Sequence, residues 1–206
     1  MPEAMAHETT RPSLLSRVRN LSDHAAWREF DETYRDLILR YCQRKGLQRS
    51  DAEDVRQMVM LNLARQLRTF SYQPERGRFR DYMGRVVQNA IHRFFRRPRP
   101  SMRGLDTDVV AGLDDEGELR ERDEAWEAEW MLHHYRRAMA TVRETAEPRS
   151  VEVFERLLAG ESTDDVAGAL DMKRDAVHKV KQRIRDRLHG LVATQLDEEE
   201  EPHAAQ

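Results

Sequence analysis

Apolar residues recur at steps of three and four through most of the chain, which is the spacing that places side chains on one face of an α-helix. Ser22 or Asp23 can cap the first such helix, and Lys45-Gly46 is expected to end it. Its apolar stripe is Trp27, Phe30, Tyr34, Leu37 and Tyr41. The stripe predicts an amphipathic helix that packs on a core.

A second helix is expected to begin at Ser50-Asp51-Ala52-Glu53, which has the residue order of a capping box. Its acidic first turn also suits the positive end of the helix dipole. Val55, Met58, Val59 and Leu63 continue the apolar pattern.

A third helix combines an apolar and a basic face. It follows a loop that Pro74 and Gly77 predict. Its buried stripe is expected to be Phe79, Tyr82, Met83, Val86, Val87, Ala90 and Phe94. Polar residues at steps of four, three and four lie on other sides of the helix, and two arginines flank them: Arg85, Asn89, His92 and Arg96, with Arg93 and Arg97. This arrangement suits a helix that packs inward and presents phosphate-binding or base-binding groups outward.

The C-terminal half predicts four more helices. The first two look structural, and their expected core residues are Trp126, Trp130, His133 and Ala138, then Val151, Phe154, Leu157 and Leu158. Ser162 opens a short helix with Asp165 as its capping partner, and Asp171-Met172-Lys173 makes a tight turn. The last helix would bury Val177, Val180, Ile184, Leu188 and Leu191. Two short helices joined by such a turn, the second of them basic, are typical of a helix-turn-helix.

Charge is segregated along the chain, although the net charge is only -3. The span Arg68–Arg99 holds nine arginines against two acidic residues, and Met172–Leu191 holds seven basic residues against two. Between these blocks, residues 104–129 contain 11 acidic residues against two arginines. Two basic blocks with an acidic segment between them suggest two polyanion-binding modules, although ordinary solvated helix faces would give the same charges.

The sequence therefore predicts an all-α protein with two helical domains and a flexible acidic linker between them. The expected boundaries are a disordered N-terminus at 1–12, a first domain at 13–97, the linker at 98–125, a second domain at 126–196 and an acidic tail at 197–206. The linker is a solubilising spacer or follows the path of nucleic acid on a partner. The tail is a candidate shield for the neighbouring basic helix.

Several other classes of protein find little support in the sequence. The longest apolar run, Met58–Leu61, is too short to span a membrane, and Met1–Thr10 has no leader-like pattern, so a cytoplasmic location is expected. The single cysteine, Cys42, excludes an internal disulfide and is expected to be a core residue. We expect no metal, cofactor or catalytic residue, because the histidines show no paired ligand spacing and no phosphate-binding glycine loop is present.

Three motifs, which follow one another along the chain, resemble motifs of the extracytoplasmic-function (ECF) group of bacterial sigma factors in the sigma-70 family. Asp51–Leu61 resembles the polymerase-docking helix, Phe79–Asn89 the promoter-melting and minus-ten-reading helix, and Ser162–Arg185 the minus-thirty-five-reading helix-turn-helix. The resemblance covers most of the chain and implies a sigma-two-like helical bundle and a sigma-four-like domain. Asp171 stands where relatives usually have Gly, and Gly84 where a larger residue is common.

The resemblance also implies partners and site residues. Core RNA polymerase would contact Asp51, Glu53, Asp54, Gln57 and Met58, although Asp51 and Glu53 can also cap their own helix. The minus-ten element of promoter DNA would contact Arg78, Arg85, Asn89, His92, Arg93, Arg96 and Arg97. Phe94 and Phe95 could stack on bases, but core packing is the simpler expectation for Phe94. The minus-thirty-five element would contact Arg174, His178, Lys181, Gln182 and Arg185, with Lys179 and Arg183 on phosphates.

An anti-sigma factor is a candidate further partner, because many relatives have one. Two rival hypotheses are a free-standing helix-turn-helix repressor and a helical scaffold or RNA-binding adaptor. The first leaves the basic helix before residue 98 without a role, and the second leaves the helix-turn-helix unexplained. Dependence on polymerase separates the sigma hypothesis from both. The target promoters and the inducing signal are not encoded in these patterns.

Overall fold

The computed structural model describes residues 14–67, 78–96 and 116–200. Within these ranges the regular elements are eight α-helices with no strand, which confirms the all-α prediction. The helices are α1 (Leu14–Arg17), α2 (His24–Arg44), α3 (Arg49–Gln66), α4 (Phe79–Phe95), α5 (Glu116–Thr145), α6 (Pro148–Leu158), α7 (Thr163–Ala169) and α8 (Arg174–Glu200).

The chain divides into two compact units. The first comprises Met1–Trp126 with Glu199–Gln206, and the second comprises Glu127–Glu198. The predicted linker and tail differ from the structure where they can be compared, because residues 116–125 belong to α5 and residues 197–200 to α8. The rest of the linker, the rest of the tail and the predicted disordered N-terminus at 1–12 lie outside the described residues.

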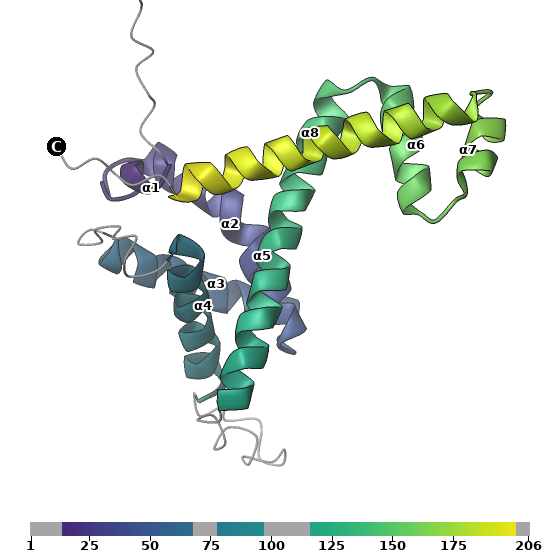
Figure 1. Ribbon diagram of the computed structural model, residues 1–206. Coiled ribbons are helices and arrows are strands. Elements are labelled where there is room, and N and C mark those ends of the chain that lie inside the picture. Colours follow the sequence, from purple (N-terminus) through teal and green to yellow (C-terminus); the bar gives the residue numbers. More distant parts are fainter. Residues whose placement is uncertain (1–13, 68–77, 97–115, 201–206) are drawn as a thin grey trace, which may run out of the picture. The chain divides into compact units, whose positions relative to one another are not determined.

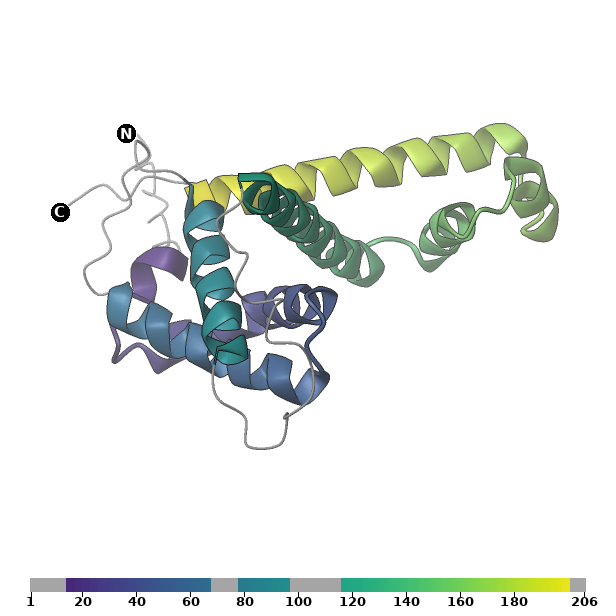
Figure 2. The same ribbon diagram turned by 90° about the horizontal axis from the view of Figure 1, so that it is seen from below.

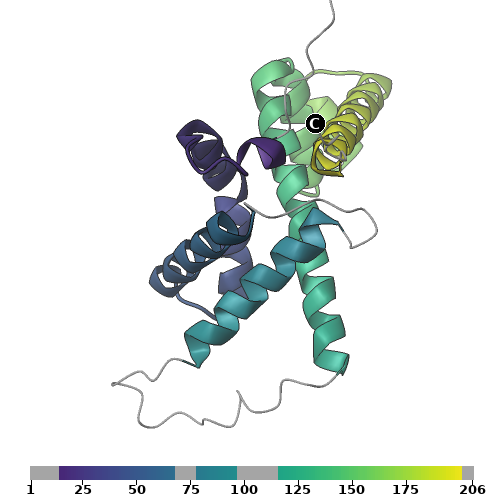
Figure 3. The ribbon, with the colours of Figure 1, turned by 90° about the vertical axis from the view of Figure 1, so that its left-hand side faces the viewer.

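In the first unit, α3 packs against both α2 and α4 (Figures 1 and 3). Aromatic rings join α2 to the start of α4, since the Phe79 ring lies 6.2 Å from that of Phe30 and 5.8 Å from that of Tyr34. The predicted stripes of α2 and α4 are buried, except that Trp27 and Tyr82 are half-buried. The Tyr82 hydroxyl donates to the Gln66 side-chain oxygen at 2.8 Å, which ties α4 to the end of α3.

The ends of α2 match the sequence prediction, whereas the start of α3 does not. Asp23 caps α2 by accepting the Ala26 N–H at 2.8 Å, and Gly46, with φ of 86°, follows its last turn. The predicted capping box at Ser50 is wrong: α3 already begins at Arg49, after an extended Gln48 that makes no side-chain cap bond. Ser50 therefore lies inside the first turn.

Cys42 lies fully buried on α2, which confirms its prediction as a core residue. Burial raises the pKa of its thiol to about 12, because a thiolate would lose its hydration there.

In the second unit, α6 and α7 pack at the N-terminal end of α8 (Figure 2). The core takes residues from α5, α6, α7 and α8, and its buried members are Ala138, Met139, Val142, Val151, Val153, Phe154, Val166, Ala167, Val177, Val180, Ile184 and Leu188. Residues from four helices thus meet in one cluster. Of the stripe predicted for α5, only Ala138 belongs to it, because Trp126 lies in the first unit and Trp130 and His133 are buried outside the cluster. Leu158 departs from the prediction, because 58% of its surface is exposed beyond the end of that core.

Candidate nucleic-acid interface

The solvent side of α4 carries the predicted basic residues. Arg85, Asn89, Arg93 and Arg96 are exposed, while His92 is half-buried. Arg78 is also exposed and precedes the helix, where its backbone N–H donates to Asp81 Oδ2 at 3.1 Å. Arg97 lies outside the described residues. We call the described set the α4 face: Arg78, Arg85, Asn89, His92, Arg93 and Arg96.

The α4 face is oriented by the apolar side of the same helix. Phe79, Met83, Val87 and Ala90 are essentially buried, so rotation of α4 about its axis would expose apolar surface to water. The guanidinium and amide groups are therefore held outward, where they can donate to phosphate oxygens or to a base edge.

The two phenylalanines at the end of α4 differ in burial. Phe94 is 5% exposed and belongs to the core, which confirms the packing interpretation. Phe95 is 46% exposed, and its ring lies 5.9 Å from that of Phe94 in an edge-to-face arrangement. Phe95 thus presents an aromatic surface beside the α4 face.

The predicted polymerase-contact residues on α3 fall into two groups. Asp54 and Gln57 are exposed, whereas Asp51, Glu53 and Met58 are half-buried. Leu61 is not among the residues expected at this site, although 59% of its surface is exposed. Leu61 follows Gln57 by four residues, and this helical spacing was the signal available in the sequence. We call Asp54, Gln57 and Leu61 the α3 face.

Glu53 is occupied by contacts within the first unit. Its carboxylate accepts from Arg56 Nε at 2.8 Å and from Arg35 Nη2 at 2.5 Å. These two hydrogen bonds hold the pKa of the Glu53 carboxyl below its usual range. Arg56 also pairs with Asp31 on α2. Glu53 thus contributes to the packing of α3 on α2, a role its position in the motif did not indicate.

The turn between α7 and α8 has a defined geometry. Ser162 caps α7 through the Asp165 N–H at 3.1 Å, as predicted, and its hydroxyl donates to the Asp165 carboxylate at 2.6 Å. Asp171 has φ of 46°, a left-handed conformation that glycine adopts without steric cost and that Asp adopts more readily than most residues. The Met172 N–H donates to the Ala167 carbonyl at 2.9 Å and the Asp171 N–H to that of Gly168 at 3.4 Å, which is a Schellman closure of the helix end.

The predicted contact residues on α8 lie on its solvent side. Arg174, His178, Lys179, Lys181, Gln182 and Arg185 are exposed and form what we call the α8 face. Two of them have partners in the chain. Arg174 Nε lies 3.5 Å from Asp164 Oδ1 on α7, and Gln182 donates to Asp186 at 2.7 Å.

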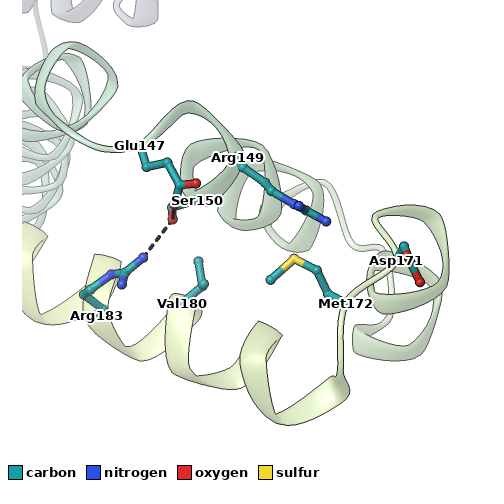
Figure 4. Close-up of a pocket in the computed structure, with 7 residues that line it drawn as sticks. All are labelled: Glu147, Arg149, Ser150, Asp171, Met172, Val180 and Arg183. Atoms are coloured by element: carbon teal, nitrogen blue, oxygen red, sulfur yellow. Dashed lines mark hydrogen bonds between the residues drawn. The ribbon is translucent and has the colours of Figure 1, made fainter.

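Arg183 differs from the rest of the set, because it bonds to the core side of the second unit. Its Nη2 donates to Ser150 Oγ at 2.8 Å, and the Ser150 hydroxyl donates to Glu147 Oε2 at 3.0 Å (Figure 4). These residues line a cavity of about 300 Å³ at the start of α6, where Arg149 donates to the Leu170 carbonyl. Arg183 therefore joins α8 to α6.

Two expected absences can be compared with the described residues. None of the described helices is long and apolar enough to cross a membrane. In the same parts of the chain, no group of three or more histidine, cysteine or acidic side chains is placed to hold a metal ion.

A known family model matches the part of the chain that carries the α3 and α4 faces. Residues 30–100 match the family model described as Sigma-70 region 2. The matched segment contains α2 from Phe30 onward, all of α3 and all of α4, and it ends before α7 and α8. No curated protein matches the chain.

Proposed function

We propose that the chain is a sigma factor of the ECF type, because residues 30–100 match the Sigma-70 region 2 family model. A domain of this kind is non-enzymatic and binds core RNA polymerase in transcription initiation. It binds core polymerase in the cytoplasm and directs initiation at promoters with a minus-ten and a minus-thirty-five element. The observation that carries this proposal is the α4 face, a row of exposed arginines and an asparagine on a helix whose other side is buried in the matched domain.

Core polymerase binds the α3 face in this proposal. Leu61 supplies apolar contact area, and Asp54 and Gln57 supply polar contacts around it. This combination of an apolar centre and a polar edge is common in protein interfaces. Glu53 supports the surface through its bonds to α2 rather than by touching the partner.

The minus-ten element binds the α4 face. The arginines neutralise phosphates on the opened strand, and Asn89 has the amide chemistry that pairs with a base edge. Phe95 offers a ring on which an unstacked base can lie.

The minus-thirty-five element binds the α8 face. The Schellman turn leads from α7 into α8, whose exposed first turns would enter a major groove. His178, Lys181 and Arg185 recur at steps of three and four along the same side of that helix. An anti-sigma factor would compete with polymerase for one of these surfaces.

The test is reconstitution with bacterial core RNA polymerase and run-off transcription from a library of genomic fragments. We expect a stable complex that initiates at fragments sharing a two-part motif. Arg85→Ala should lower initiation about tenfold, because one base or phosphate contact contributes roughly 1 to 3 kcal/mol.

Arg28→Ala is the matched control, because Arg28 is also an exposed arginine of the first unit but lies on α2 and is not part of the α4 face. It should leave initiation unchanged. Failure to bind core polymerase, together with a shift of duplex DNA by the chain alone, would favour the repressor hypothesis.

A further inference from the structure

Gly84 lies in the middle of α4, at a site that has no room for a side chain. A Cβ added there would stand 2.8 Å from Nε1 and 2.9 Å from Cδ1 of Trp126. Contacts this short do not occur between packed carbon and nitrogen atoms, so the indole can take this position only against a glycine. Gly84 costs helix propensity, and the close approach of Trp126 explains its presence.

We call the place where the Trp126 indole lies against Gly84 the slot, and two further contacts within the first unit hold the indole there. The Trp126 side chain is 2% exposed. The indole N–H donates to the Arg80 carbonyl on α4 at 2.9 Å, and the ring meets Tyr41 of α2 edge to face at 5.1 Å between centroids. The Tyr41 hydroxyl accepts a further bond from Gln88 of α4 at 3.4 Å.

The slot lies close to the α4 face. Gly84 directly precedes Arg85, and Gln88 directly precedes Asn89, so both of these residues are followed by a residue of the face. Adjacent residues on a helix point about 100° apart. Contacts on the slot side therefore fix the rotation of α4 and, through it, the direction of Arg85 and Asn89.

We propose that Trp126 is a positioning residue for minus-ten recognition, so that the functional first domain extends beyond the family-matched segment into α5. This inference rests on the proposed function. Recognition by several side chains on one helix tolerates displacements of only about 0.5 Å. An indole seated against the backbone of α4 supplies that constraint from a residue 26 positions beyond the end of the match at residue 100.

The contact itself is tested by a double-mutant cycle in the full chain. Gly84→Ala should lower the melting temperature by several degrees, because the new methyl group meets the indole. In a Trp126→Ala background the same substitution should not lower it. Gly190→Ala is the matched control, since Gly190 lies in a helix with nothing within 4 Å of an added Cβ. Equal effects of Gly84→Ala on the melting temperature in both backgrounds would contradict the contact between Gly84 and Trp126.

Fluorescence measures the burial of the Trp126 indole independently. The chain has three tryptophans, so Trp27→Phe and Trp130→Phe leave Trp126 as the single emitter. Its emission should lie at short wavelength, as for a buried indole, and Gly84→Ala should shift it to longer wavelength. An unchanged spectrum would contradict the contact.

The positioning role is tested by initiation with core polymerase, at a temperature where circular dichroism shows every variant fully folded. Trp126→Ala should lower initiation about tenfold without changing the affinity for core polymerase. Trp126→Phe, which keeps a ring in the slot, should restore most of the loss. Initiation by Trp126→Ala at the wild-type level would overturn the proposal, provided that Arg85→Ala is impaired in the same assay. If Arg85→Ala also initiates normally, it is the proposed function of the α4 face that fails.

Discussion

Individual arginines in this chain serve two different purposes. Arg56 bonds to Glu53 and Asp31, and Arg183 bonds to Ser150, so these side chains connect helices. Arg85 and Arg185 are exposed on the α4 and α8 faces. A helical repeat predicts which side of a helix an arginine occupies, but its bonding partner comes from another helix. The same residue type therefore contributes to the fold at one position and, in the proposed function, to binding at another.

His133 is the residue with the clearest pH signature. It is 4% exposed on α5, and burial, reinforced by His134, Arg137 and Arg136, lowers its pKa to about 3. The folded chain keeps His133 neutral while the unfolded chain takes up a proton below about pH 6.5. Stability is therefore present above that pH and is lost as the pH falls from about 6.5 towards 3.

Between pH 7.5 and 5.5 the loss in unfolding free energy should be about 1.4 kcal/mol, measured by urea denaturation at the two pH values. His133→Gln should remove most of this difference. His178→Gln, at an exposed histidine of α8, should retain it. A decline of the same size in His133→Gln would mean that another group is responsible.

At the scale of elements, side-chain hydrogen bonds to α5 and α6 hold α8 in position, and they do not involve the α8 face. Arg183 donates to Ser150 of α6, and one turn later Arg187 donates to Thr145 at the end of α5, both at 2.8 Å. In the proposed function the α8 face binds DNA in a fixed orientation, which requires that these two hydrogen bonds remain formed. Arg183, which the resemblance places on phosphates, is better explained as a residue that links α8 to α6.

Arg183→Ala and Arg185→Ala provide a matched comparison on one helix. Arg183→Ala leaves the buried Ser150 hydroxyl with one partner fewer and should lower the stability of the chain by about 1 kcal/mol. It should leave the salt dependence of DNA binding unchanged. Arg185→Ala should leave stability unchanged and reduce the salt slope by about 1, as expected for one lost phosphate contact. Thermal denaturation and binding titrations at several salt concentrations measure both effects, and the opposite pattern would return Arg183 to the DNA contacts.

Element boundaries show where the sequence predicts well and where it does not. The ends of α2 and the start of α7 follow from local capping residues, Asp23, Gly46 and Ser162, and local bonds decide them. The capping-box pattern misplaces the start of α3, because Glu53 has the residue type of a capping partner but bonds to Arg35 and Arg56. The predicted linker is too long, because residues 116–125 contain enough helix formers to continue α5 despite their acidic charge.

For the whole molecule, the two units have separate sources of stability. The core cluster of the second unit runs from Ala138 to Leu188 and draws no residue from the first. The contact between Gly84 and Trp126 is long-range and crosses the predicted linker, so no local pattern could indicate it. Periodicity predicts which face of a helix is buried, while the partner of that face follows only from the assembled chain.

A fragment spanning residues 127–198 should therefore fold alone. We expect a helical circular dichroism spectrum and a cooperative thermal transition, because the fragment contains the whole cluster. Ile184→Ala, at a residue 2% exposed, should remove about 2 to 5 kcal/mol and abolish or greatly lower that transition. The neighbouring Arg185→Ala should not change it. A gradual, non-cooperative melt of the unmutated fragment would show that the unit depends on the rest of the chain.

The burial of Cys42 has a practical consequence for labelling chemistry. Because its pKa is about 12, almost none of this thiol is ionised at neutral pH, and the thiolate is the form that maleimides and peroxides attack. The folded chain should resist alkylation and mild oxidants without any substitution. A cysteine introduced at an exposed position, such as Arg28→Cys in the first unit or Lys179→Cys in the second, would react selectively. Probes attached to that pair would measure the distance between the units in a chain that keeps its native thiol.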